Sequence, residues 1–292
     1  MPETPDHPFP PAPRRPHRAV LWLGPILASY ASARVLEVFP GSVPHLAIVA
    51  LDVLSAAAFA LVDGARTYSL RTILVFAGLC TVVGNVVENI GVATGFPFGR
   101  YQFLELMGPR VFGVPVLLGL AYLGMAYASW RVASLILGSR RGLVYRPALA
   151  SVIMTAWDLA QDPVWGTVLH GWIWRDGGAW FGVPLSNYCG WLGTVFLIYL
   201  LFALYLRRAG RASQGDQRRR WAVIFYGLCA LGNVLETIPR PGPSLVADAT
   251  GRIWRIADIT RAAALVSTLG MGSFALVAWL RADRKAPAGV TG

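Results

Sequence analysis

Residues 156–187, AWDLAQDPVWGTVLHGWIWRDGGAWFGVPLSN, place two aspartates inside an apolar stretch that then opens into a connection rich in Trp and Gly. Asp158 and Asp162 are four residues apart, so on a helix they share one face. Further tryptophans extend that face or follow in the connection: Trp165, Trp172, Trp174 and Trp180. The stretch therefore predicts buried acids beside aromatic rings that can hold a large apolar ligand.

The composition around this stretch is that of a membrane protein. The 292 residues are 55% hydrophobic and only 14% charged, and the mean hydropathy is +0.52. A water-soluble domain of this size does not show such a profile. We expect an all-α, polytopic helical membrane bundle, with residues 1–16 as a disordered tail, residues 17–281 as a single transmembrane domain and residues 282–292 as a second tail.

Apolar runs long enough to cross a bilayer recur along the chain. Because a membrane helix needs about 20 apolar residues, these runs predict about eight transmembrane helices. They cover residues 17–39, 44–63, 71–94, 111–137, 147–170, 188–206, 221–239 and 259–280. Clusters of Gly, Pro and charged residues separate them and are expected to form the connections.

The basic residues indicate the orientation of the bundle. The connections on the side of the two tails contain 17 of the 26 Lys and Arg residues, and those on the opposite side contain 7. The positive-inside rule therefore places both termini in the cytoplasm of a cell membrane protein. Since these flanking residues account for the net charge of +11, we expect no nucleic-acid partner.

Three acids fall where lipid should exclude them. At a helical rise of ~1.5 Å per residue, Glu88, Asp158 and Asp162 lie near the middle or in the outer half of the bilayer. An acid at that depth costs about 2.5–3.5 kcal/mol on insertion scales, so we expect these three to be functional. The connections 95–101 and 171–187 are predicted on the same outer side, which suggests an acid-lined pocket capped by aromatic loops.

Other polar residues allow simpler interpretations. Glu37 lies near an interface and Asp52 can pair with Arg34 on the neighbouring helix, so a structural role is favoured for both acids. Glu236 remains open between structure and function, and His170 is best explained as an interfacial hydrogen-bonding residue. The tryptophans fit an interfacial aromatic belt as well as a ligand site.

A short motif that occurs twice in the sequence suggests an internal repeat. Residues 84–88, GNVVE, match residues 232–236, GNVLE. In each copy an Asn three residues before a Glu can hydrogen-bond the carboxyl group, and Gly allows close helix approach. Because the two spans run in the same direction, a parallel four-plus-four repeat is one interpretation.

Several kinds of chemistry lack their usual sequence signals. The four His residues show none of the spaced pairs of a membrane di-iron enzyme, and the three Cys residues form no CxxC pair. The chain also has no GxGxxG unit, P-loop or GxSxG elbow. We therefore expect neither a cofactor nor a metal.

Several ordered motifs between residues 85 and 191 resemble a known family. They are ENIG at 88–91, TGFPFGRY at 94–101, GVP at 113–115, AWDLAQDP at 156–163, GW at 171–172, GVPLSN at 182–187 and GW at 190–191. This pattern resembles the membrane carotenoid-biosynthesis family of CruF-type carotenoid 1′,2′-hydratases.

The resemblance implies addition of water across the terminal C1′=C2′ double bond of an acyclic carotene end group, of the γ-carotene or lycopene type. The carotene would come from the lipid bilayer, water would be the co-substrate, no cofactor would be needed, and other carotenoid-pathway enzymes would be compatible partners. An acid withdrawn from water can keep its proton and deliver it to an alkene. Asp158 is our candidate donor, with Asp162 or Glu88 to orient water and accept its proton, although coupled acids share their protons.

The remaining candidates support this chemistry. Asn85 and Asn187 are possible water-positioning groups, and Glu236 and His170 are further supporting polar residues. Aromatic side chains are expected to enclose the end group: Phe96, Phe98, Tyr101, Trp157, Trp165, Trp172, Trp174 and Trp191.

Three other functions share some of these features. A membrane lycopene cyclase protonates the same end group but closes a ring. A prenyltransferase would use the Asp158-xxx-Asp162 spacing for magnesium and diphosphate, but the second Asp-rich motif that it requires is missing. A proton-coupled transporter would also keep acids at mid-membrane depth.

Overall fold

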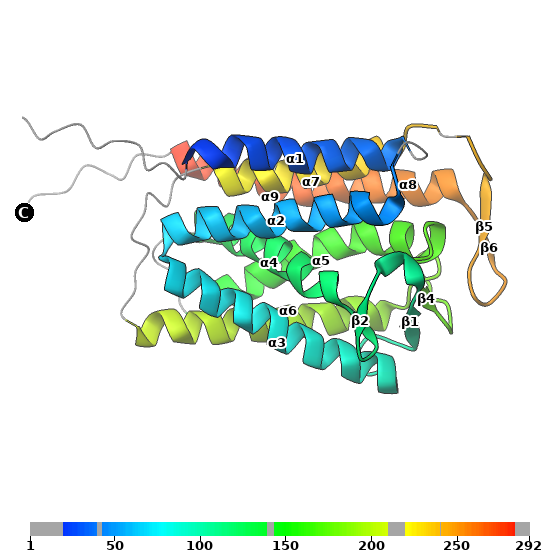
Figure 1. Ribbon diagram of the computed structural model, residues 1–292, viewed down its shortest axis with the longest axis horizontal. Helices are drawn as coiled ribbons and strands as arrows, with labels where there is room; N and C mark the ends of the chain where they lie inside the picture. The colour runs from blue at the N-terminus through cyan, green and yellow to red at the C-terminus, as the bar shows by residue number, and fades with distance from the viewer. Residues whose placement is uncertain (1–19, 40–42, 139–142, 210–219, 240, 284–292) are drawn as a thin grey trace, which may run out of the picture.

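The computed structural model describes residues 20–39, 43–138, 143–209, 220–239 and 241–283. The predicted tail 1–16 and nearly all of the tail 282–292 lie outside these residues. Each predicted apolar run coincides with a helix (Figure 1). The helices are α1 (Val20–Val38), α2 (His45–Thr67), α3 (Leu70–Thr94), α4 (Val116–Leu137), α5 (Tyr145–Asp162), α6 (Leu185–Arg208), α7 (Trp221–Leu235), α8 (Ile256–Leu265) and α9 (Gly272–Asp283).

Two π-helical turns extend this pattern. Pro163–Val168 continues α5 by a turn, and Val266–Met271 joins α8 to α9 in one continuous helix. At the first of these, Pro163 lacks the N–H that would continue the α-helical ladder, so the hydrogen-bond pattern changes at that residue.

Local sequence chemistry explains where the helices begin and end. Pro44, Pro115 and Pro184 directly precede α2, α4 and α6; proline fixes its own φ and has no N–H to leave unpaired. Ser69 caps α3 by accepting a hydrogen bond from the Thr72 N–H at 3.2 Å. Gly95 ends that helix with a φ of 81°, a conformation that glycine adopts without steric cost.

Helix α4 forms the centre of the bundle. It packs against α2, α3, α5, α7 and α9, and aromatic side chains around it are almost fully buried: Phe59, Phe76, Tyr122, Tyr127, Trp130, Tyr199, Phe202 and Phe225. Large apolar side chains such as Leu54, Leu74 and Val82 are more than half exposed on the outside. This apolar outer surface, like the buried core, is expected for a helical bundle that faces lipid.

Five of the described helical segments are long and apolar enough to cross a membrane. They are α2, α3, α4, α6 and the continuous segment Ile256–Ala282, and α7 is a shorter apolar helix. The chain is thus a helical membrane protein. The count of eight spans stays a prediction, because α1, α5 and α7 do not meet this criterion on their own.

Short strands occupy connections that the sequence predicted only as loops. β1 (Tyr101–Phe103) pairs antiparallel with β4 (Trp172–Trp174), β2 (Arg110–Val111) with β3 (Val114–Pro115), and β5 (Leu245–Ala247) with β6 (Ile253–Arg255). The start predicted at residue 111 for the fourth span is therefore wrong, because the β2–β3 hairpin precedes α4.

The first and last described residues of the chain lie at the same end of the bundle (Figure 1). The first residues of α1 and the last residues of α9 are at one end, and the strands are at the other (Figure 1). This arrangement agrees with an even number of spans. The assignment of the first end to the cytoplasm remains a prediction.

The two copies of the GNV(V/L)E motif make different contacts. Asn85 donates to the carbonyl of Thr81 in its own helix at 2.8 Å and not to Glu88. Asn233 accepts from the Arg34 guanidinium at 3.0 Å and donates to Ser267 at 2.8 Å. The two copies of the motif therefore share no hydrogen-bond pattern at their Asn residues. The four-plus-four repeat stays a prediction from the sequence.

Candidate active site

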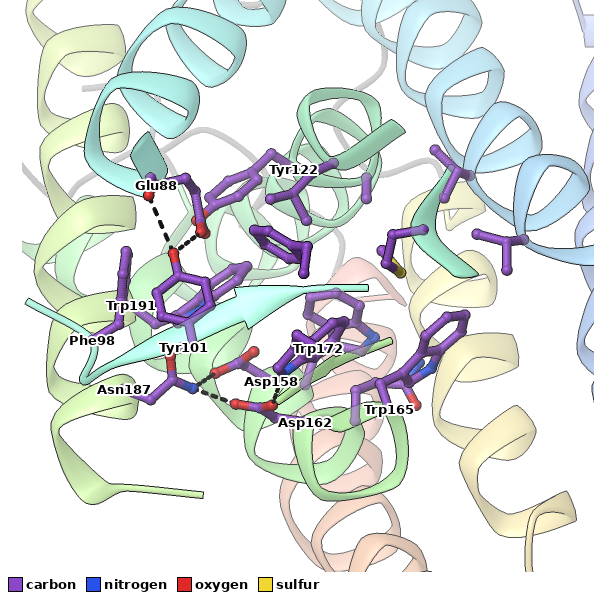
Figure 2. A pocket seen from close by; sticks show the side chains of 18 of the residues that line it. Glu88, Phe98, Tyr101, Tyr122, Asp158, Asp162, Trp165, Trp172, Asn187 and Trp191 are labelled. Atoms are coloured by element: carbon purple, nitrogen blue, oxygen red, sulfur yellow. Dashed lines mark hydrogen bonds between the residues drawn. The ribbon is translucent and has the colours of Figure 1, made fainter. Parts of the chain in front are cut away.

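A cavity opens at the end of the bundle that carries the strands. The empty space in it, including open solvent at its mouth, is about 850 Å³. Helices α2 to α6 form its walls, and the β1–β4 ribbon covers it (Figure 2). The lining residues are Val49, Asp52, Val53, Glu88, Phe98, Tyr101, Phe103, Met107, Leu118, Ala121, Tyr122, Trp157, Asp158, Gln161, Asp162, Trp165, Trp172, Trp174, Asn187 and Trp191.

The three acids predicted to be functional all line this cavity. Glu88 comes from α3, whereas Asp158 and Asp162 come from α5, and their exposed fractions are 4%, 5% and 1%. Asp158, Asp162 and Trp165 lie along one face, as their spacing predicts. Trp165 stays on this face although it belongs to the π-helical turn after α5.

Asp162 is held by three hydrogen-bond donors. Its Oδ1 accepts from the indole N–H of Trp172 at 2.6 Å and of Trp174 at 3.2 Å. Its Oδ2 accepts from the amide Nδ2 of Asn187 at 2.5 Å (Figure 2). Donors aimed at a carboxyl group stabilise its charged form, so this arrangement suits a carboxylate at Asp162.

Asp158 has fewer partners. Its Oδ2 accepts from the same Asn187 Nδ2 at 3.1 Å, and no hydrogen bond joins its Oδ1 to any residue that the structure describes. The Asn187 amide therefore links the two acids. Asp162 has three hydrogen-bond donors, whereas Asp158 has one. This asymmetry makes Asp158 the acid better suited to carry a proton.

Glu88 is held by two tyrosines from different elements. Its Oε2 accepts from the hydroxyl of Tyr101 at 2.5 Å, and its Oε1 accepts from the hydroxyl of Tyr122 at 2.7 Å. The Tyr122 ring stacks on Trp191 with centroids 4.7 Å apart. Tyr101 and Tyr122 thus position Glu88 at the edge of an aromatic wall.

The β1–β4 ribbon explains why so many rings face the acids. Tyr101 pairs with Trp174 and Phe103 pairs with Trp172, and side chains two apart on a strand point to one side. All four rings therefore line the cavity, while Gln102 between them binds Arg175 on the outside.

An exposed ion pair joins the two connections beside this ribbon. Arg100 hydrogen-bonds Asp176 through two of its nitrogens, and this contact holds the pKa of the Asp176 carboxyl below its usual value. Asp176 therefore stays ionised at neutral pH and keeps the pair intact.

Most of the predicted aromatic residues also line the cavity, but four predicted site residues do not. Phe96 is 74% exposed on the outside of the turn that follows α3, because the left-handed Gly95 directs the chain away from the helix. Asn85 is turned back onto its own helix. Glu236 is buried beyond the end of α7, and His170 lines a separate cavity with Thr167 and Asp248.

Three polar residues that line the cavity were not among the predicted site residues. Tyr122 was not considered, although it binds Glu88. Asp52 was assigned a structural role, yet it lines the cavity, and its buried Oδ1 has no hydrogen-bond partner among the described residues. Gln161 was the easiest to find, since it lies three residues after Asp158 and so shares its helix face.

The described residues contain no group of three or more His, Cys, Asp or Glu side chains that could hold a metal ion. The polar groups of the cavity are acids, amides, phenols and indole N–H groups, and the remaining lining side chains are apolar. Such a site can transfer protons and bind an apolar molecule.

Comparison with known proteins identifies the family. The family model described as "Carotenoid biosynthesis protein" matches residues 46–247, a range that includes every residue of the cavity. The chain belongs to this family. The resemblance seen in the sequence motifs is therefore confirmed.

The chain is similar to the bisanhydrobacterioruberin hydratase of Haloarcula japonica. The two chains are 32% identical over 128 residues, which is 42% of each chain. The match thus spans less than half of the relative. No solved structure matches the chain.

Proposed function

We propose that the protein adds water to the terminal C1′=C2′ double bond of an acyclic carotene end group, of the γ-carotene or lycopene type, to give a tertiary 1′-alcohol. One observation carries this proposal: three buried acids line one cavity together with nine aromatic side chains. Membership of the carotenoid biosynthesis family and the similarity to a protein named as a hydratase support it.

Asp158 is the proton donor in this proposal. Its Oδ1 has no hydrogen bond to the described residues, so this oxygen can present a proton to the cavity. The O–H bond breaks as the π electrons of the alkene form a bond from C2′ to the proton. A tertiary cation is left at C1′, the more substituted carbon.

The aromatic wall stabilises this cation. Trp157, Trp165 and Trp191 line the cavity, and the face of an aromatic ring attracts positive charge. Trp157 and Trp191 are in edge-to-face contact with centroids 6.1 Å apart, so the two rings present different sides to the cavity. The rings also exclude bulk water, so fewer unoriented water molecules can react with the cation.

Asp162 or Glu88 completes the reaction. Water forms the C1′–O bond with an oxygen lone pair, and its released proton goes to a carboxylate. Asp162 suits this role because its three donors stabilise the charged form and because Asn187 links it to Asp158. Transfer of the proton back to Asp158 restores the starting state, so the cycle consumes only carotene and water.

The arrangement of the bundle suggests where the reactants come from. Carotene is apolar and enters from the lipid bilayer, whereas water reaches the site from the end of the bundle that carries the strands. With both termini in the cytoplasm, that end lies on the outer side of the cell membrane. The reaction as written needs no cofactor, and other carotenoid-pathway enzymes can supply the carotene.

Pigment analysis tests this proposal. Bacterial cells that accumulate lycopene or γ-carotene would express the protein, its Asp158→Asn variant and an Asp258→Asn variant. Asp258 is an exposed acid outside the cavity and provides the same substitution as a control. We expect a product heavier by one water from the wild type and the control, and a loss of about 10²- to 10⁴-fold in Asp158→Asn. An isomer of unchanged mass would instead indicate a cyclase, and unchanged pigments would favour a transporter.

A further inference from the structure

The two amides that the sequence suggested for water have other hydrogen-bond partners in the structure. Asn85 hydrogen-bonds the carbonyl of Thr81 and lies outside the cavity. Asn187 lies inside, but its Nδ2 already donates to both Asp158 and Asp162 (Figure 2). A neutral side chain of the cavity without such partners is therefore the better candidate to hold the water that attacks the cation.

Gln161 is a neutral amide in the cavity wall. Its side chain lines the cavity and is 8% exposed. The buried Oε1 has no hydrogen-bond partner within the described parts of the chain. Buried polar groups rarely remain unpaired, so such a group calls for a missing partner. An amide oxygen accepts hydrogen bonds from water, and rotation of the side-chain amide turns this oxygen toward the cavity that Gln161 lines.

The position of Gln161 matches the reaction. It follows Asp158 by three residues on α5, so the two side chains are neighbours, with Cβ atoms about 5–6 Å apart on an ideal helix. A water on Gln161 would therefore lie close to the alkene that Asp158 protonates. Asp162, the next residue along the chain, lies on the same side to accept the released proton.

We propose that Gln161 binds and orients the water that captures the carotenoid cation. This inference rests on the proposed hydratase function. The Gln161 Oε1 accepts a hydrogen bond from one O–H of the water, which points the oxygen lone pair at C1′. The C1′–O bond forms, and the proton released from the water goes to Asp162. Gln161 itself gains and loses no proton.

Loss of Gln161 predicts a distinctive failure. Asp158 still protonates C2′, but the cation at C1′ meets no oriented water. It then loses a proton from a neighbouring carbon to the Asp158 carboxylate, and the C=C bond forms again. In heavy water this cycle places deuterium in carotene that has not been hydrated. Protonation and water capture can therefore be measured separately.

The experiment uses the full chain in lipid nanodiscs with lycopene in heavy water, followed by mass spectrometry of both alcohol and residual carotene. We expect Gln161→Met, which keeps the length of the side chain, to lower alcohol formation at least tenfold while deuterium still enters the residual carotene. Gln161→Glu keeps an acceptor oxygen and should recover part of the alcohol. Gln102→Met is the matched control, since Gln102 binds Arg175 outside the cavity.

Each outcome has a defined meaning. Unchanged alcohol formation in Gln161→Met would overturn the role of Gln161, and so would loss of both alcohol and deuterium in a variant that elutes as folded protein. Asp158→Asn should lose both signals. A wild-type protein that forms no alcohol and exchanges no deuterium would overturn the hydratase function itself, and with it this inference.

Discussion

The hydrogen bonds between Glu88 and its two tyrosines allow a quantitative test of the charge on this acid. Glu88 is 4% exposed, and the Tyr101 hydroxyl donates to its Oε2 at 2.5 Å. Tyr101→Phe removes only this hydroxyl and keeps the ring that packs near Trp174. A hydrogen bond to a charged group contributes about 1.5–3 kcal/mol, and one between neutral groups about 0.5–1.5 kcal/mol.

A double-mutant cycle uses this difference. In the wild type we expect Tyr101→Phe to lower the free energy of unfolding by about 1.5–3 kcal/mol. In a Glu88→Gln background the same change should cost about 0.5–1.5 kcal/mol, because the acceptor is neutral. The coupling between the two residues is then about 1 kcal/mol, which a cycle can resolve.

The assay is equilibrium unfolding in detergent micelles, with Tyr122→Phe as a second, independent partner of Glu88. Coupling from both tyrosines would show that Glu88 is a carboxylate and can accept a proton from water. Equal costs of the tyrosine substitutions in the wild type and in the Glu88→Gln background would refute this reasoning, since Glu88 would then behave as a neutral acid.

Two further substitutions test the geometry of the site. Gly91→Ala places a Cβ 2.7 Å from a ring carbon of Phe98 and 2.9 Å from the Tyr101 hydroxyl. We expect this overpacking to lower the free energy of unfolding, measured by thermal unfolding, by about 1–3 kcal/mol. A wild-type melting profile would contradict this packing. Trp172→Phe removes the indole N–H that donates to Asp162 at 2.6 Å. A hydrogen bond to a charged group contributes about 1.5–3 kcal/mol, so the initial rate of alcohol formation should fall about tenfold to a hundredfold. An unchanged rate would exclude Asp162 as an oriented base.

The sequence predicts the helices well because lipid imposes a simple rule. Only a long apolar run can cross a bilayer as a helix, so length and hydropathy locate most of the elements. The spacing of Asp158, Asp162 and Trp165 likewise predicts their common face, because this depends only on helix period. The same rule applies to Gln161, which was overlooked although the signal was present.

Contacts between distant parts of the chain were not predictable in the same way. The β1–β4 pairing joins Tyr101 to Trp174, and no local pattern specifies a partner so far along the chain. The alternation of rings at Tyr101 and Phe103 is compatible with a strand but too short to identify one. For the same reason, the sequence did not reveal that Tyr122 binds Glu88.

Individual side-chain directions were also beyond the sequence. Asn85 lies three residues before Glu88, and this spacing permitted a bond to the acid; in the structure the amide instead binds the Thr81 carbonyl. Phe96 belongs to the aromatic loop but follows Gly95, whose left-handed conformation leaves the ring exposed. Such choices depend on neighbours that only the fold brings together.

The most direct test of the central claim follows the oxygen atom of the product. The purified protein in nanodiscs would be given lycopene in water labelled with heavy oxygen, and the products would be separated by chromatography and weighed by mass spectrometry. The account predicts a carotenoid alcohol whose hydroxyl carries the heavy oxygen, and none from Asp158→Asn. A product without the label, or an isomer of lycopene without added oxygen, would contradict it.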